Sequence, residues 1–204
     1  MRQELAEKLT EKRPRGRPQK YKNTEALHQA IEVFWRYGYE GASLSNLTSA
    51  LSMNRPSIYG AFGNKQQLFM LCLQTYVNEQ LAFVDEAIKQ KTLSEVIETL
   101  FSKQIELLTK NKRGCMLVQA ALSCSEETNS IKDQLTEQRK LIEAKLRKRF
   151  QIAQLKKDSA SSESPAASAK YMATLYQGLS VQAASGATKK ELTEVVNLAK
   201  KVLN

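Results

Sequence analysis

The residues best suited to binding a polyanion lie in one short segment near the N-terminus. Positions 12 to 22 hold six basic side chains and no acidic one: Lys12, Arg13, Arg15, Arg17, Lys20 and Lys22. Pro14-Arg15-Gly16-Arg17-Pro18 matches the core of an AT-hook, an extended strip that lies in the narrow minor groove of A·T-rich DNA. We therefore expect residues 1–22 to form a flexible basic arm that contacts DNA through Arg13, Arg15 and Arg17.

A solvated tail is the ordinary alternative for such a run of like charge. DNA binding is favoured because two short predicted helices follow the arm. Ser43 should cap the first, and the second should run from about Arg55 to Phe62 with Pro56 in its first turn. The connection at Ser52–Asn54 is so short that it forces a steep crossing, which is typical of a helix-turn-helix.

The second of these helices would present its N-terminal residues to base edges in the major groove. Arg55 and Ser57 stand at that end, and Arg55 is able to grip a guanine bidentately. Tyr59 carries a hydroxyl suited to a phosphate oxygen, and Lys65 adds charge to the N-terminus of the next helix. Gly60 and Ala61 are small, so this reading helix is sparse in base-contacting groups and would need support from the arm.

Helical periodicity dominates the rest of the chain, and no period-two strand pattern appears. A first helix should begin at Asn23 or Thr24 and stop at Gly38, while a long helix after Asn64 should carry an apolar face. That face is Leu68, Leu71, Tyr76, Leu81 and Val84. Further helices are expected at about residues 94–111, 114–124, 128–156, 165–184 and 189–202. The predicted fold is all-α, with a helix-turn-helix domain at residues 23–66 and a larger helical body at 67–204.

Composition narrows the function further. The 204 residues carry a net charge of +10, and the three cysteines, Cys72, Cys115 and Cys124, have no metal-type spacing. We expect no metal, no cofactor and no membrane partner, and a cytoplasmic location, because no signal peptide or membrane-length apolar run is present. The body has no histidine, phosphate loop or nucleophile elbow, so an enzyme is not predicted.

The stretch from Thr24 to Phe69 resembles the N-terminal domain of TetR/AcrR-type transcriptional regulators. The resemblance lies in FWRYGYEGASLSNL (Phe34–Leu47) and RPSIYGAFGNKQQLF (Arg55–Phe69), and more loosely in the ending from Tyr176 to Leu192. It implies a homodimer on double-stranded DNA, with a body that binds a small-molecule effector and forms the dimer. It also implies that Ser45, Arg55, Ser57, Gly60 and Ala61 face the groove, and that Ser43, Tyr59 and Lys65 contact the backbone.

The chain departs from the family where the turn usually has glycine, since Ser52 stands there. A left-handed backbone at a non-glycine residue costs roughly 1 kcal/mol, which is tolerable. Candidates for the effector site are core-like residues of the predicted body: Cys72, Tyr76, Cys115, Gln119, Leu122, Ser123, Tyr171, Met172 and Leu175. Most of them would serve as packing in any case, and Cys115 is either a thiol sensor or, as we favour, a buried structural cysteine.

Two functions follow from these residues. The leading one is a ligand-responsive regulator, most simply a repressor, that binds a near-palindromic operator as a homodimer and is released by its effector. The alternative is an architectural DNA-binding protein without an effector, in which the arm dominates and sequence specificity is low.

Overall fold

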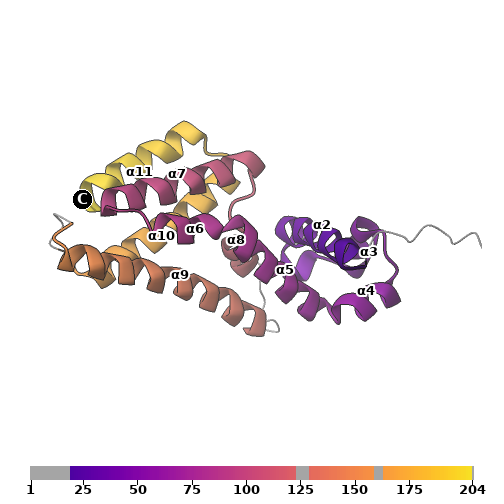
Figure 1. Ribbon diagram of the computed structural model, residues 1–204. Helices are drawn as coiled ribbons and strands as arrows, with labels where there is room; N and C mark the ends of the chain where they lie inside the picture. Colours follow the sequence, from indigo (N-terminus) through magenta and orange to yellow (C-terminus); the bar gives the residue numbers. More distant parts are fainter. Residues whose placement is uncertain (1–18, 123–128, 159–162, 204) are drawn as a thin grey trace, which may run out of the picture.

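The computed structural model describes residues 19–122, 129–158 and 163–203, and in these ranges all regular structure is helical. The molecule is elongated (Figure 1). At one end, α2 (Gln19–Gly41), α3 (Leu44–Leu51) and α4 (Arg55–Phe62) form a unit that we call the reading head. The helix α5 (Lys65–Gln80) leads from the head into a larger unit, the body.

The body holds the remaining helices. These are α6 (Ala82–Ala87), α7 (Leu93–Asn111), α8 (Met116–Leu122), α9 (Asn129–Leu155), α10 (Pro165–Ala184) and α11 (Lys189–Leu203). Helix α10 packs along α9 and also against α7, while α11 packs on α7 (Figure 1). No helix of the described ranges is long and apolar enough to cross a membrane.

The first helix differs from its prediction at both ends. It begins at Gln19 rather than at Asn23 or Thr24, so the predicted N-cap is wrong. Gly38 does not end it but kinks it, because this glycine takes a positive φ of 69° and the helix resumes as far as Gly41. The kink lets Tyr39 turn back onto Phe69 of α5, with ring centroids 5.2 Å apart.

The long helix expected after Asn64 is two helices. Asn64 caps α5 as predicted, through its side chain and the backbone N–H of Gln67, but the helix stops at Gln80 and α6 starts at Ala82. Leu71, placed on the apolar face by the sequence, is 43% exposed, so that assignment is wrong. Leu68, Tyr76, Leu81 and Val84 are buried.

One apolar core runs through both parts of the molecule. Helix α2 packs against α5 and also against α8 of the body, with the ring of Trp35 set edge-on to Tyr76 at 5.3 Å. The predicted boundary at residue 66 therefore falls at the start of α5, next to continuous packing. The domain division remains a prediction.

Candidate DNA-reading surface and candidate effector site

The turn between α3 and α4 fixes the angle of the two short helices. Ser43 caps α3, since its hydroxyl accepts the backbone N–H of Asn46 at 3.0 Å. At the other end Ser52 adopts the left-handed conformation with φ 51° and ψ 37°, as the sequence suggested, and Met53 N–H donates to Thr48 O at 3.2 Å. The helices then close on one apolar contact: Leu47, Leu51, Ile58 and Phe62 are all buried.

Because α4 is anchored by its buried side, its polar residues are left in solvent. Asn54 caps the helix by accepting the backbone N–H of Ser57 at 2.9 Å. Arg55, Ser57, Tyr59 and Gly60 are exposed, Ala61 is half-buried, and Ser45 is exposed in the first turn of α3. The local fold thus brings together the predicted groove-facing residues on one solvent-facing head.

The residues predicted to contact the DNA backbone make more interactions within the protein than the groove-facing residues do. The Ser43 hydroxyl also donates to Asn46 Oδ1 at 2.5 Å, so it is committed to the cap of α3. Lys65 is half-buried at the start of α5, where its ammonium lies 4.7 Å from the centre of the Tyr39 ring and 3.3 Å from Glu40 O. Burial lowers the pKa of Lys65, and the nearby Glu40 carboxylate partly opposes that shift. Arg13, Arg15 and Arg17 lie outside the described residues.

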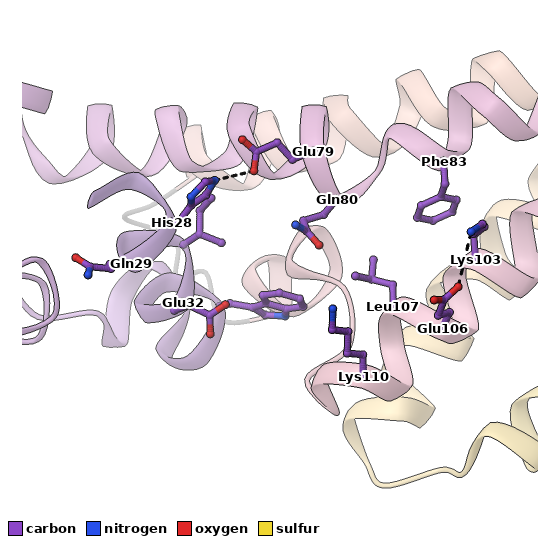
Figure 2. Close-up of a pocket in the computed structure, with 12 residues that line it drawn as sticks. His28, Gln29, Glu32, Glu79, Gln80, Phe83, Lys103, Glu106, Leu107 and Lys110 are labelled. Carbon is purple, nitrogen blue, oxygen red and sulfur yellow. Dashed lines mark hydrogen bonds and ion pairs between the residues drawn. The ribbon is translucent and has the colours of Figure 1, made fainter. Parts of the chain in front are cut away.

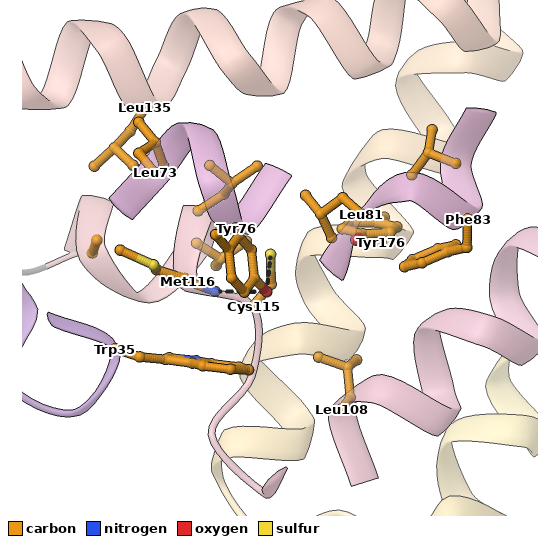
Figure 3. Close-up of a cluster of buried hydrophobic side chains, with 14 of the residues drawn as sticks. Trp35, Leu73, Tyr76, Leu81, Phe83, Leu108, Cys115, Met116, Leu135 and Tyr176 are labelled. Atoms are coloured by element: carbon orange, nitrogen blue, oxygen red, sulfur yellow. Dashed lines mark hydrogen bonds between the residues drawn. The ribbon is translucent and has the colours of Figure 1, made fainter. Parts of the chain in front are cut away.

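A second cluster is buried where α5, α8 and α10 meet (Figure 3). The Tyr76 hydroxyl lies 3.5 Å from the Cys115 sulfur and accepts the backbone N–H of Met116 at 3.3 Å. Cys115 N–H donates to Ser180 Oγ of α10 at 2.6 Å. Burial is the main cause that raises the pKa values of Tyr76, Cys115 and Tyr176 above their usual range. Sequence reasoning predicted Tyr76 and Cys115 and missed Ser180.

The cysteines fit the structural interpretation better than the sensor one. Cys115 is fully buried, and desolvation raises the pKa of its thiol. Arg113, two residues before Cys115, is a cation that could favour a reactive thiolate, but its guanidinium pairs with Glu32 at 2.5 Å. Cys72 is also buried between α2 and α5, its thiol 3.8 Å from Leu27 O, and burial raises its pKa.

The other predicted effector residues are spread over the body. Met172 is buried and Leu175 is half-buried on α10, but Tyr171 is 41% exposed and lies apart from the cluster. Gln119 lines a cleft of about 410 Å³ beside Trp35 and Arg113. Neither the Leu122 side chain nor Ser123 is among the described parts.

Two residues that the sequence did not single out complete the buried site. The Gln104 side-chain amide donates to Tyr176 O at 2.6 Å, from α7 to α10. Among the described residues no partner is found for the buried Gln104 Oε1, while the buried Tyr176 hydroxyl interacts with the Cys115 thiol. A glutamine on the apolar side of a predicted helix was the available signal, because buried polar groups need partners.

The segment from Arg113 to Met116 joins the head to the body. Trp35 Nε1 donates to Gly114 O at 3.0 Å, so this buried residue links α2 to the segment that leads into α8. Gly114 has a positive φ of 73°, and a Cβ placed on it would lie 2.6 Å from Ser180 O. A side chain at position 114 would therefore clash with the backbone of α10.

Comparisons with known proteins agree with this geometry. Residues 26–71 match the model of "Bacterial regulatory proteins, tetR family". The solved structure of a cysteine mutant of the TetR family transcriptional regulator CifR, complexed with 26-bp double-strand operator DNA, is similar over 93% of this chain and 98% of that chain. Its TM-score is 0.84 and its sequence identity is 32%. HTH-type transcriptional repressors of Escherichia coli strain K12 are also similar: ComR is 24% identical over 90% of both chains, and BdcR is 25% identical over 94% of both.

Proposed function

The chain belongs to the TetR family, so it is a DNA-binding transcriptional regulator and not an enzyme, and we propose that it is an effector-released repressor acting as a homodimer. One observation carries the proposal: α4 is locked onto α3 by buried side chains while Arg55, Ser57 and Tyr59 stay exposed at its N-terminal end. A recognition helix in the major groove is anchored in the same way, with the residues of its N-terminal end free to contact base edges. The repressor role is supported by the names of the relatives ComR and BdcR.

The DNA contacts that we propose divide by chemistry. Arg55 and Ser57 read bases, with Ser45, Gly60 and Ala61 at the groove. Tyr59 and Lys65 contact phosphates, which fix the register of the head but carry no sequence information. Ser43 contacts phosphate through the N-terminus of α3 that it caps, and Arg13, Arg15 and Arg17 extend the contact into the minor groove.

The dimer is supported by an exposed apolar surface on the last two helices. Large side chains on α10 and α11 remain in solvent: Tyr171, Val181, Val195, Leu198 and Val202. A patch of this kind marks an interaction site on a soluble protein. Two copies related by a two-fold axis would bury the same patch against itself and set two reading heads side by side.

The effector site that we propose is the buried cluster around Tyr76 and Cys115. Its support is the buried Gln104 Oε1, for which no partner is found among the described residues and to which a ligand could donate a hydrogen bond. Met172, Leu175 and Gln119 flank the cluster in this proposal. Ligand binding and DNA binding would favour different placements of the heads, so each would lower the affinity for the other.

Selection of bound sequences from random DNA by the full-length protein tests the proposal. We expect a near-palindromic consensus whose half-site centres lie about 34–36 Å apart, or a multiple of that spacing, because two heads read from the same side of the duplex. Binding to the selected site should survive excess random DNA. Absence of any enriched sequence, with equal affinity for random DNA, would favour the architectural alternative.

A further inference from the structure

A cleft of about 680 Å³ lies between the reading head and the body (Figure 2). Helix α2 forms one wall, α7 forms the other, and the end of α5 with the start of α6 lies between them. The volume is typical of small-molecule sites. None of the residues of the proposed effector site lines this cleft, so it is a separate feature of the molecule.

The inner surface of the cleft is apolar. Ile31 and Trp35 of α2 and Phe83 of α6 line it and are largely buried, while Leu107 of α7 is half-buried and points into the space between the walls (Figure 2). This surface suits an aliphatic chain or an aromatic ring, which gains free energy when it leaves water.

Most charged groups around the cleft already have partners. His28 lies 2.7 Å from Glu79, and Lys103 lies 3.8 Å from Glu106. Glu32 is paired with Arg113 outside the cleft. In the Lys103–Glu106 and Glu32–Arg113 pairs each carboxylate is matched by a cation.

Lys110 is the exception. It lies in the last turn of α7, its side chain points toward Gln80 across the cleft, and no ion pair to it is found within the described residues (Figure 2). The side-chain amide of Gln80 likewise has no hydrogen-bond partner in that part of the chain. An unpaired ammonium and a free amide donor next to apolar side chains fit one kind of ligand, an anion attached to an apolar group.

We propose that this cleft binds a small organic carboxylate, with the carboxylate at Lys110 and Gln80 and the apolar part against Phe83 and Leu107. Its walls belong to the head and to the body, so the bound molecule contacts both. Binding at the cleft is independent of the proposed repressor function, because it requires neither DNA nor the buried cluster.

Trp35 gives this site its own reporter. It is the single tryptophan of the chain, and it lines the cleft, so the protein has one indole N–H resonance. The full-length protein is titrated with 4-phenylbutyrate, octanoate and 2-naphthoate, and the shift of that resonance is followed. The control ligand is 4-phenylbutylamine, which keeps the apolar part and reverses the charge. We expect saturable shifts with at least one carboxylate and weaker binding of the amine.

Variants of exposed lysines test the role of charge without disturbing the core. Lys110→Gln should weaken carboxylate binding about tenfold, the order expected for a charge-assisted hydrogen bond. Lys110→Glu should reverse the preference toward the amine. The matched control Lys89→Gln removes a charge from an exposed lysine that does not line the cleft, and it should leave binding unchanged.

Any of three results overturns the proposal. The first is no saturable shift with the three carboxylates at millimolar concentration. The others are an amine that binds as well as the carboxylates, or a Lys110→Gln variant that binds carboxylate as well as the parent protein does. Thermal unfolding of each variant shows whether it is folded. None of these results bears on operator binding, so failure here leaves the proposed function intact.

Discussion

Gly60 lies exposed in the middle of the reading helix, and a Cβ placed on it would meet no atom within 4 Å. A helical glycine with free space around it is not required by the fold, and alanine is preferred there by about 1 kcal/mol. Its small size is instead suited to close approach of a ligand surface. In the proposed complex that surface is the DNA groove.

We predict that Gly60→Ala makes the protein more stable, by up to about 1 kcal/mol, and weakens operator binding. Chemical unfolding followed by circular dichroism and fluorescence anisotropy with labelled operator measure the two effects. Gly178→Ala, at a helical glycine of α10 that is equally open, isolates the gain in helix stability. If Gly60→Ala binds the operator with unchanged affinity, the DNA groove does not approach α4 closely at this position.

Arg55 is the residue of α4 whose side chain can distinguish one base from another. Its side chain is exposed at the start of the helix, directly after the Asn54 cap. We predict that Arg55→Ala costs about 1–3 kcal/mol at one base position and relaxes the preference there. Affinities for operators with each base substituted in turn provide the measurement. A uniform loss on all sequences would show that Arg55 contacts phosphate only.

At the scale of elements, the turn between α3 and α4 holds one strained residue, although the helix-turn-helix around it is well packed. Ser52 is left-handed, and a non-glycine residue in that conformation costs roughly 1 kcal/mol. The buried contacts of Leu51 and Phe62 hold it there. The strain is therefore offset by packing that neither helix makes alone.

Ser52→Gly should stabilise the protein by up to about 1 kcal/mol while operator affinity stays the same, because the backbone keeps its path. Ser49→Gly is the matched control: Ser49 is exposed inside α3, and glycine there should destabilise by about 0.5 kcal/mol, the difference between the helix propensities of serine and glycine. Midpoints of denaturant unfolding compare the two. A loss of stability in Ser52→Gly would show that the left-handed backbone at Ser52 is not strained.

At the scale of the whole molecule, the segment from Arg113 to Met116 makes hydrogen bonds to both the head and the body. Trp35 Nε1 donates to Gly114 O from the head side, and Ser180 Oγ accepts Cys115 N–H on the body side. These two hydrogen bonds connect α10 to α2 through this segment. This arrangement gives the proposed effector response a physical route.

We predict that Trp35→Phe lowers stability by about 1–3 kcal/mol, because the buried Gly114 carbonyl loses its donor while most of the aromatic packing is kept. Denaturant unfolding measures the loss. Tyr37→Phe, an exposed aromatic of the same helix, serves as control and should have little effect. Equal stabilities of Trp35→Phe and the parent protein would mean that water replaces the indole.

The proposed dimer is also a property of the whole molecule. Leu198 of α11 is 64% exposed in the single chain, and we predict that Leu198→Glu yields a folded monomer with greatly weakened operator binding. Sedimentation gives the mass, and circular dichroism verifies folding. Asn197→Glu adds the same charge to a neighbouring exposed position outside the apolar patch, and it should remain dimeric. A dimeric Leu198→Glu would refute this interface.

The sequence by itself determined the elements whose signals are local. Asn54 and Pro56 set the start of α4, Ser43 and Asn64 cap α3 and α5, and Pro165 opens α10, because caps and proline act within one turn. The family and the reading head followed from these residues together with FWRYGYEGASLSNL. Helix ends without such a signal, at Gln19 and Gln80, were predicted wrongly.

Only the tertiary structure decided which distant residues meet. The kink at Gly38 turns Tyr39 onto Phe69, and the contacts of Trp35 with Gly114 and of Gln104 with Tyr176 join positions more than seventy residues apart. The cleft at Lys110 exists only between packed helices. Periodicity specifies which face of a helix is apolar, but the partner of that face depends on how all the helices pack together.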